Sequence, residues 1–263
     1  MNHAEILRSA LDNAALWAQL STHRLSLFLD YDGTLTPIVE RPEQALLDPS
    51  VRDVLRELAR KVPVGIVSGR DRNDVERLVD LSGIAYAGCH GFDIRDASGG
   101  LAELPLPPGM ETRIGEIAAW LCRSLGTTPG VEVEAKRYAV VVHVRRAEER
   151  IIPEVRAVVD QAVDEHPGVR RSGGKKIFEI LPNVPWDKGH AVSFLLETAD
   201  DASNRLPVYI GDDVTDEDGF RAVADQGVGI LVSDAPRDTQ ASYRLKDPDE
   251  VHRFLQRLSG IIV

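Results

Sequence analysis

The sequence is poor in cysteine, in long apolar runs and in positive charge, and each shortage excludes a class of protein. Two cysteines in 263 residues, Cys89 and Cys122, form neither a disulfide framework nor a metal-binding pattern, so a reducing cytoplasm is the simplest setting. No apolar stretch is long enough to span a bilayer, and the charged N-terminus is not typical of a signal peptide. With 31 basic and 42 acidic residues the formal charge is −11, which disfavours a nucleic-acid or membrane partner.

What the chain does have, between residues 25 and 88, is a regular alternation of two kinds of segment. LSLFLD at 25–30 and VPVGIVSGR at 62–70 are short and apolar, whereas DPSVRDVLRELARK at 48–61 starts with Asp-Pro and repeats apolar residues at helical spacing. Near-continuous apolar strands separated by helices predict a parallel sheet covered on both faces. Helical spacing also predicts an N-terminal helix from Ile6 to Trp17.

The pattern changes after Gly91. DIRDASGGLAEL at 93–104 and GVRRSGGKKIFEILP at 168–182 each predict a hairpin, the second turning at Gly173–Gly174. VEVEAKRYAVVVHVRR at 131–146 alternates apolar and polar residues and predicts two further antiparallel strands. With the helical segments between them, these stretches predict an α+β unit.

Strand–helix alternation resumes with WDKGHAVSFLLETA at 186–199 and LPVYIGDD at 206–213. The predicted fold class is therefore α/β, a Rossmann-like parallel-sheet core interrupted by an inserted α+β domain. We expect the core to comprise residues 1–90 and 181–263, and the insert residues 91–180.

Two aspartates, Asp30 and Asp32, directly follow the first apolar strand in LFLDYDGTL. Residues two apart point the same way from an extended chain, so both carboxylates can face one site. At roughly 4 Å two such charges repel by about 4 kcal/mol near a protein surface. A turn closed by Asp side chains is the structural alternative, but it accounts poorly for two aspartates followed by Gly33-Thr34.

A second acidic cluster, in YIGDDVTDEDG, follows another apolar strand. Asp216 to Asp218 suit a helix N-terminus, but Asp212 and Asp213 are not explained by capping. An EF-hand frame fails because Val214 and Asp225 occupy its ligand positions. Carboxyl ends of parallel strands meet at one sheet edge, and Mg²⁺ held by two or more of these carboxylates would relieve their repulsion.

Two more residues at predicted sheet edges suit a phosphate group. Ser68 follows the strand in GIVSGR and offers a hydroxyl donor, and Lys188 begins a helix and offers an ammonium. Considered by itself, a single serine or lysine is more simply explained as a solvated surface residue. Their place in the order of acidic motifs favours a functional role.

Four motifs follow one another along the chain: Asp30-Tyr-Asp32-Gly-Thr, Ser68-Gly-Arg70, Lys188 and Gly211-Asp212-Asp213-x-Thr215-Asp216-Glu217. They resemble the four motifs of the haloacid dehalogenase-like phosphatases, and the insert is similar to their C2-type cap domain. Further stretches are Gly88-Cys-His90-Gly91, Lys136…His143-x-Arg145, Gly174-Lys175-Lys176-x-x-Glu179 and Asp187-Lys188-Gly189. They resemble the trehalose-6-phosphate phosphatase family, although His143-Val144-Arg145 lacks the aromatic residue expected between His and Arg.

The resemblance implies a Mg²⁺-dependent phosphatase that hydrolyses trehalose 6-phosphate through an aspartyl-phosphate. It implies that Asp30 is the nucleophile, that Asp32 is the general acid and base, and that Ser68 and Lys188 hold phosphoryl oxygens. Metal ligands implied are the carboxylates of Asp30 and Asp212 and the main-chain carbonyl of Asp32, with Asp213 and Asp216 in or near the surrounding shell. The residues implied in substrate binding are Gly69, Arg70, His90, Lys136, Arg137, His143, Arg145 and Glu179.

Purely structural roles remain possible for several of these implied substrate-binding residues. Arg70 is as well suited to bracing its own motif, His90 to a structural role, and the four basic residues at 136–145 to the solvated face of a sheet. We expect a monomer that acts on a small phosphorylated sugar.

Three other functions compete with trehalose 6-phosphate hydrolysis. A sibling phosphatase acting on sucrose-phosphate, a glycosyl-phosphoglycerate or an aminocyclitol phosphate would share the core motifs and differ only in the insert. A phosphoacceptor signalling domain would also combine acidic residues, a hydroxyl and a lysine, but it needs neither Asp32 nor the insert. A serine hydrolase is disfavoured because Gly65 and Gly69 are wrongly placed around Ser68 for a nucleophile elbow.

Overall fold

The computed structural model describes residues 7–39, 41–102, 104–173, 176–199 and 201–262. The chain forms two compact units, one made of Met1–Ala102 and Trp186–Val263 and the other of Glu103–Pro185. Each unit has its own sheet and its own apolar core.

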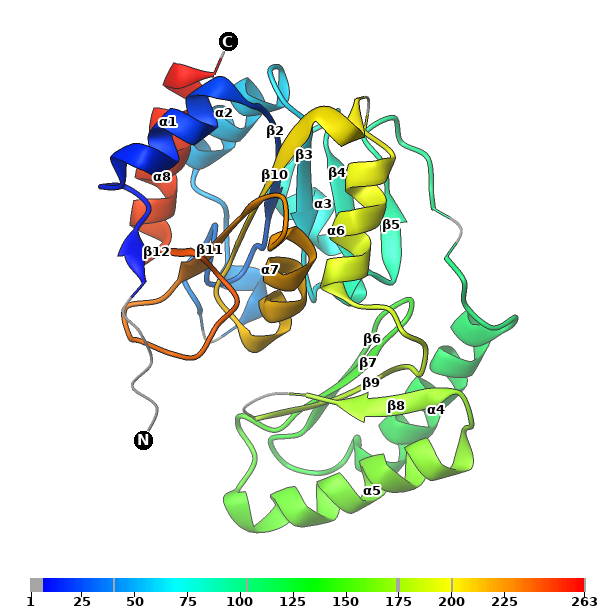
Figure 1. Ribbon diagram of the computed structural model, residues 1–263. Helices are drawn as coiled ribbons and strands as arrows, with labels where there is room; N and C mark the ends of the chain where they lie inside the picture. The colour runs from blue at the N-terminus through cyan, green and yellow to red at the C-terminus, as the bar shows by residue number, and fades with distance from the viewer. Residues whose placement is uncertain (1–6, 40, 103, 174–175, 200, 263) are drawn as a thin grey trace. The chain divides into compact units, whose positions relative to one another are not determined.

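The larger unit is built on an eight-stranded sheet in the order β1-β12-β11-β10-β2-β3-β4-β5 (Figure 1). All neighbours pair in parallel except β4 and β5, which confirms the parallel-sheet core expected from the apolar strands. The strands are β1 (Arg8–Ser9), β2 (Arg24–Leu29), β3 (Val64–Val67), β4 (Ala85–Gly88), β5 (Asp93–Arg95), β10 (Arg205–Gly211), β11 (Val228–Val232) and β12 (Tyr243–Leu245).

Helices cover both faces of this sheet. Leu27 and Leu29 of β2 belong to one core cluster with apolar residues of α1, α2, α3 and α8. The helices α6 and α7 pack against the other face, where Leu195 of α6 lies beside Gly65 of β3 (Figure 1). The helices are α1 (Ala14–Thr22), α2 (Pro49–Ala59), α3 (Arg72–Val79), α6 (Lys188–Glu197), α7 (Glu217–Val223) and α8 (Pro248–Ile261).

The chain start differs from the sequence prediction. The expected helix from Ile6 to Trp17 is wrong between Leu7 and Asn13, because Arg8 and Ser9 form β1 and pair with β12. Ile6 lies outside the described residues. The helix α1 begins only at Ala14, where the Asn13 side chain caps it by accepting a hydrogen bond from the Leu16 backbone. No helix in the part of the chain that the structure describes is long and apolar enough to cross a membrane.

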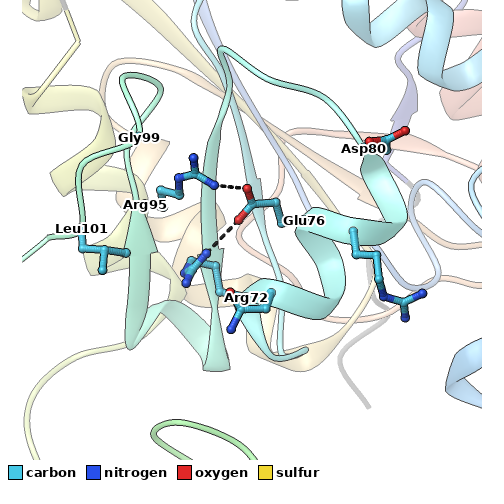
Figure 2. A pocket seen from close by; sticks show the side chains of 8 residues that line it. Arg72, Glu76, Asp80, Arg95, Gly99 and Leu101 are labelled. Carbon is cyan, nitrogen blue, oxygen red and sulfur yellow. Dashed lines mark hydrogen bonds and ion pairs between the residues drawn. The ribbon is translucent and has the colours of Figure 1, made fainter.

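An ion-pair network ties the edge strand β5 to α3. Glu76 lies between Arg72 and Arg95 and pairs with both guanidinium groups (Figure 2). These side chains line a pocket on the larger unit. Arg72 Nε is also 3.2 Å from Asp93 Oδ1, and both side chains are buried. The ion pairs connect β5 to α3, and antiparallel pairing with β4 joins it to the larger sheet. Residues 91–102, which the sequence places in the insert, therefore lie in the larger unit.

The smaller unit has a four-stranded antiparallel sheet in the order β6-β7-β9-β8, packed on two helices. Val140, Val142 and Ile180 face the helices and form its core. This is the α+β composition predicted for the insert. Its elements are α4 (Met110–Leu125), β6 (Glu132–Ala135), β7 (Val140–His143), α5 (Ile152–Glu165), β8 (Val169–Ser172) and β9 (Ile177–Pro182).

Candidate active site

Three neighbouring strands deliver the predicted site residues to one edge of the larger sheet. The central strand β2 pairs in parallel with β10 on one side and with β3 on the other. Their carboxyl ends are followed by Asp30, Asp212 and Ser68, respectively. Residues 182 positions apart in the chain therefore meet because the strands that precede them are paired (212 − 30 = 182).

Lys188 joins two of the acidic motifs. It is the first residue of α6, which Asp187 caps by accepting a hydrogen bond from the His190 backbone. The Lys188 Nζ donates to Asp30 Oδ1 at 3.0 Å and to Asp216 Oδ1 at 2.7 Å, and all three side chains are at most 6% exposed. Burial alone would lower the pKa of Lys188, but the two carboxylates raise it, so the ammonium stays charged.

Asp216 is the most completely hydrogen-bonded group of the cluster. Besides Lys188, its carboxylate accepts hydrogen bonds from the Tyr209 hydroxyl at 2.6 Å and from the backbone N–H groups of Asp212 and Asp213 at 2.9 Å each. Burial would raise the pKa of Asp216, but Lys188 and the other donors lower it. A carboxylate has about four lone-pair sites, so protein donors already occupy those of Asp216.

For Asp30 and Asp212, in contrast to Asp216, the surroundings disfavour the charged carboxylate. Burial raises the pKa of Asp30 well above its usual range despite Lys188, and burial together with the charge of Asp216 raises the pKa of Asp212 to about 7. Carboxylate oxygens of Asp30, Asp212 and Asp216 lie within 4.8 Å of one another. Among them, Asp30 and Asp212 lack enough compensating positive charge.

The acidic cluster therefore fits a divalent metal ion. Asp212 Oδ1 is buried and has no hydrogen-bond partner among the described residues, and hard divalent cations prefer such oxygens. Gly33 makes room for this carboxylate, since it has φ +79° and a Cβ there would lie 2.1 Å from Asp212 Oδ2. Because the oxygens of Asp216 already accept protein hydrogen bonds, Asp30 and Asp212 are the better ligands.

The structure places the carboxylates of Asp32 and Asp213 outside this group of oxygens. Asp32 Oδ2 and Oδ1 accept hydrogen bonds from Arg70 Nε at 2.6 Å and Nη2 at 2.7 Å. Arg70 also donates to Asp74 at 2.9 Å and lies over the ring of Tyr31, so it braces the first two motifs. Asp213 is exposed and takes part in the cluster through its backbone N–H.

Ser68, Gly69 and His90 lie together at the end of β3. The Ser68 side chain is buried, and its Oγ accepts a hydrogen bond from the Arg70 backbone at 3.2 Å. That arrangement leaves the hydroxyl proton available for an anion. Gly69 lies against the imidazole of His90, because a Cβ on this glycine would be 2.7 Å from His90 Cε1.

The remaining predicted residues lie in the smaller unit. His143 Nε2 is 2.9 Å from Glu134 Oε2, and strand register puts both on the sheet face opposite α4 and α5, together with buried Glu179. Arg137 pairs with Glu111 at 3.2 Å, so part of this basic stretch serves the unit's own structure. Lys136 begins the turn between β6 and β7, Arg145 is exposed after β7, Lys176 pairs with Glu149 at 3.1 Å, and Gly174 and Lys175 lie outside the described residues.

Tyr209 is the one contributor to the cluster that sequence reasoning misses. It sits within the apolar strand β10, where an aromatic residue is an ordinary core choice. Its hydroxyl is nevertheless directed at Asp216. The only signal in the sequence is a tyrosine three residues before Asp212, which by itself predicts nothing.

Comparison with known proteins identifies the family to which the sequence is similar. The sequence model of the trehalose-phosphatase family matches residues 28–249. The chain is 42% identical over 241 residues to the probable trehalose-phosphate phosphatase 4 of Oryza sativa subsp. japonica, covering 89% of this chain and 66% of that protein. It thus spans about two thirds of the length of such curated relatives.

Solved structures show the same fold. The crystal structure of a trehalose-6-phosphate phosphatase related protein superposes with a TM-score of 0.76 at 26% identity, covering 89% of this chain and 96% of that chain. A haloacid dehalogenase-like hydrolase from B. subtilis superposes with a TM-score of 0.60 at 17% identity, covering 88% of this chain and 99% of that chain. The second likeness is one of fold alone.

Proposed function

Because the chain belongs to the trehalose-phosphatase family, we propose that it hydrolyses trehalose 6-phosphate to trehalose and phosphate. The observation that carries the proposal is the convergence of Asp30, Lys188, Asp212 and Asp216 at one sheet edge, with Ser68 following the adjacent strand. Such a set can attack, hold and neutralise a phosphoryl group.

In the proposed first step, an Asp30 carboxylate oxygen attacks phosphorus, and the bond from phosphorus to the sugar oxygen breaks. Asp32 gives its proton to the departing sugar oxygen, so that an aspartyl-phosphate and free trehalose result. In the second step Asp32 takes a proton from water, the water oxygen bonds to phosphorus, and the bond between phosphorus and Asp30 breaks. Asp30 is thereby restored as a carboxylate.

Hydrogen-bond donors of the site assist both proposed steps. Lys188 lies 3.0 Å from Asp30 and would hold a phosphoryl oxygen as charge grows on it, and the Ser68 hydroxyl would donate to another. Arg70 orients the Asp32 carboxylate through two parallel hydrogen bonds. We assign Arg70 to this orienting role ahead of direct contact with the substrate.

We propose Mg²⁺ as the cofactor. The Asp30 and Asp212 carboxylates and the Asp32 main-chain carbonyl would hold it, with Asp213 and Asp216 around them. When bound, the ion supplies positive charge that lowers the repulsion between an anionic phosphate and these carboxylates. The raised pKa values of Asp30 and Asp212 support this assignment.

We propose that the smaller unit selects the sugar. Glu179, His143 and Glu134 share one face of its sheet and offer acceptors and a donor of the kind that bind sugar hydroxyl groups. Lys136, Arg137 and Arg145 are further candidates, while His90 and Gly69 are candidates in the larger unit. We propose a monomer in the cytoplasm, a setting supported by the low cysteine content of two in 263 residues.

Phosphate release from a panel of phosphorylated sugars, with Mg²⁺ and with EDTA, tests the proposal. We expect turnover of trehalose 6-phosphate to exceed that of the other sugars and to stop with EDTA. A preference for sucrose-phosphate, a glycosyl-phosphoglycerate or an aminocyclitol phosphate would identify a sibling phosphatase. Slow release from acetyl phosphate without any sugar turnover would point instead to a phosphoacceptor domain.

A further inference from the structure

A strained turn follows β4 at the same edge of the larger sheet. Cys89, His90 and Gly91 have successive φ angles of +50°, +57° and +95°, all in the left-handed region. Two of the three carry a Cβ, for which this conformation is unfavourable. Strain of this kind persists only where the surroundings impose it, and it is concentrated at functional sites. We call residues 89–91 the left-handed turn.

One side of the left-handed turn fixes the Ser68 segment. The Cys89 N–H donates to the Arg70 carbonyl at 2.7 Å, and the His90 N–H donates to the Ser68 carbonyl at 3.0 Å. The Ser68 N–H in turn donates to the Ala87 carbonyl of β4 at 2.8 Å. The backbone that presents the Ser68 hydroxyl is therefore held on both sides by β4 and its following turn.

The other side of the left-handed turn fixes the start of α6. Trp186 Nε1 donates to the Gly91 carbonyl at 2.7 Å. Gly91 also packs directly on this helix, since a Cβ there would lie 2.7 Å from Ala191 Cβ and 2.9 Å from the Asp187 carbonyl oxygen. The turn thus contacts residues on both sides of Lys188, namely Trp186 and Asp187 before it and Ala191 after it.

We propose that Trp186 is a positioning residue, which acts through Gly91 and the left-handed turn to fix the placement of Lys188 relative to Ser68. The catalytic part of this inference rests on the proposed phosphatase function. Ser68 and Lys188 come from segments 120 residues apart (188 − 68 = 120), and the left-handed turn is hydrogen-bonded to both of those segments. Trp186 itself touches neither the nucleophile nor the metal ligands in any contact the structure records.

The variant that tests this role is Trp186→Phe, which keeps an aromatic ring and removes the donor to Gly91. Misplacement of a catalytic group by about 1 Å costs up to about a hundredfold in rate, and we expect a loss of about tenfold here. Most of the loss should appear in kcat, because the two groups hold the phosphoryl group most strongly in the transition state. KM should change by no more than about twofold, because the sugar also contributes to substrate binding, whereas inorganic phosphate depends on these groups alone.

Trp17→Phe is the matched control. Trp17 Nε1 donates to the Leu11 carbonyl at 2.9 Å, and its ring packs on Phe254 at 4.9 Å, so the control removes the same kind of hydrogen bond away from the sheet edge. Both variants are compared by melting temperature and by phosphate release per folded molecule, well below the melting transition. The control should keep the wild-type kcat.

A second readout does not need turnover. Inorganic phosphate with Mg²⁺ should raise the melting temperature of the wild-type protein and of Trp17→Phe, and raise that of Trp186→Phe clearly less. A Trp186→Phe protein with wild-type kcat and a wild-type phosphate response overturns the inference. So does a loss of activity that only follows the folded fraction in both variants.

The two proposals fail differently. If the wild-type protein releases phosphate from none of the sugars, the proposed function is wrong, whatever the tryptophan variant does. The positioning role is then decided by the phosphate-induced melting shift alone, where equal shifts in wild type and Trp186→Phe refute it.

Discussion

Arg70 holds both carboxylate oxygens of Asp32, with Nε 2.6 Å from Oδ2 and Nη2 2.7 Å from Oδ1. The guanidinium is the fixed partner of the pair, because its side chain is 10% exposed, whereas that of Asp32 is 41% exposed. Further hydrogen bonds to Asp74 and to the Pro42 carbonyl fix it in place. A mostly buried cation with several hydrogen bonds thus orients a more accessible carboxylate, which the proposed role of Asp32 as general acid and base requires.

Replacement of Arg70 by Lys should lower kcat about ten- to a hundredfold, since an ammonium cannot make two parallel hydrogen bonds to Asp32. Steady-state kinetics on trehalose 6-phosphate measure the effect. Arg77→Lys is the control, because Arg77 is exposed and pairs only with Asp74 at 2.7 Å among the contacts recorded. In an Asp32→Asn background the Arg70 change should have almost no further effect, and full additivity of the two losses would refute the orienting role.

Asp30→Asn should abolish turnover, with a loss of at least about a thousandfold, because the amide cannot serve as the phosphoryl acceptor. The fold should persist, since Lys188 keeps its hydrogen bond to Asp216 at 2.7 Å. Circular dichroism and a melting curve check the fold, and phosphate release checks the activity. Substantial activity in a folded Asp30→Asn protein would assign the nucleophile elsewhere.

The sequence predicts best what is decided by strand periodicity and chain order. Asp30, Ser68 and Asp212 are predicted to meet because each follows an apolar strand, and parallel strands end at one edge of their sheet. Lys188 is predicted from its position at a helix start between these motifs. The parallel core and the antiparallel sheet of the smaller unit follow from the change of apolar period near residue 91.

The sequence does not predict features that depend on the direction of a side chain or on the pairing of very short strands. The two-residue strand β1 replaces part of an expected helix because it pairs with β12, which is far away in the chain. The strand β5 joins the larger sheet by pairing with β4, and the ion pairs of Arg95 with Glu76 and of Asp93 with Arg72 link it to α3. The direction of Arg70 toward Asp32, and of Tyr209 toward Asp216, depends on tertiary packing that no local pattern encodes.

Asp212→Asn should have opposite effects with and without metal. In metal-free protein it should raise the melting temperature, because it removes one of several crowded carboxylates, the one whose pKa burial and Asp216 raise to about 7. Saturating Mg²⁺ should raise the wild-type melting temperature by about 5–10 °C and leave Asp212→Asn almost unchanged. Asp225→Asn, an exposed carboxylate after α7, is the control and should respond to Mg²⁺ as wild type does. An undiminished Mg²⁺ response in Asp212→Asn would place the ion elsewhere.

Tyr209→Phe should lower kcat about five- to tenfold with little change in KM, because Asp216 loses one of four donors and holds Lys188 less firmly. Tyr86→Phe is matched to it, since Tyr86 is also a buried strand tyrosine and donates to the Leu81 carbonyl at 2.8 Å. Both variants should lose similar stability in urea titrations. If both retain the wild-type kcat, the Tyr209 hydroxyl serves stability alone.

Glu179→Ala should raise KM for trehalose 6-phosphate about tenfold and leave p-nitrophenyl phosphate turnover nearly unchanged. The reason is that Glu179, buried in β9 of the smaller unit, is proposed to accept hydrogen bonds from sugar hydroxyl groups, which the aryl substrate lacks. Glu132→Ala is the control, because Glu132 is exposed and pairs with Arg146 at 2.7 Å. The ratio of kcat/KM for the two substrates is the deciding measurement. If Glu179→Ala lowers kcat/KM equally for both substrates, this carboxylate supports the fold of the smaller unit and does not bind the sugar.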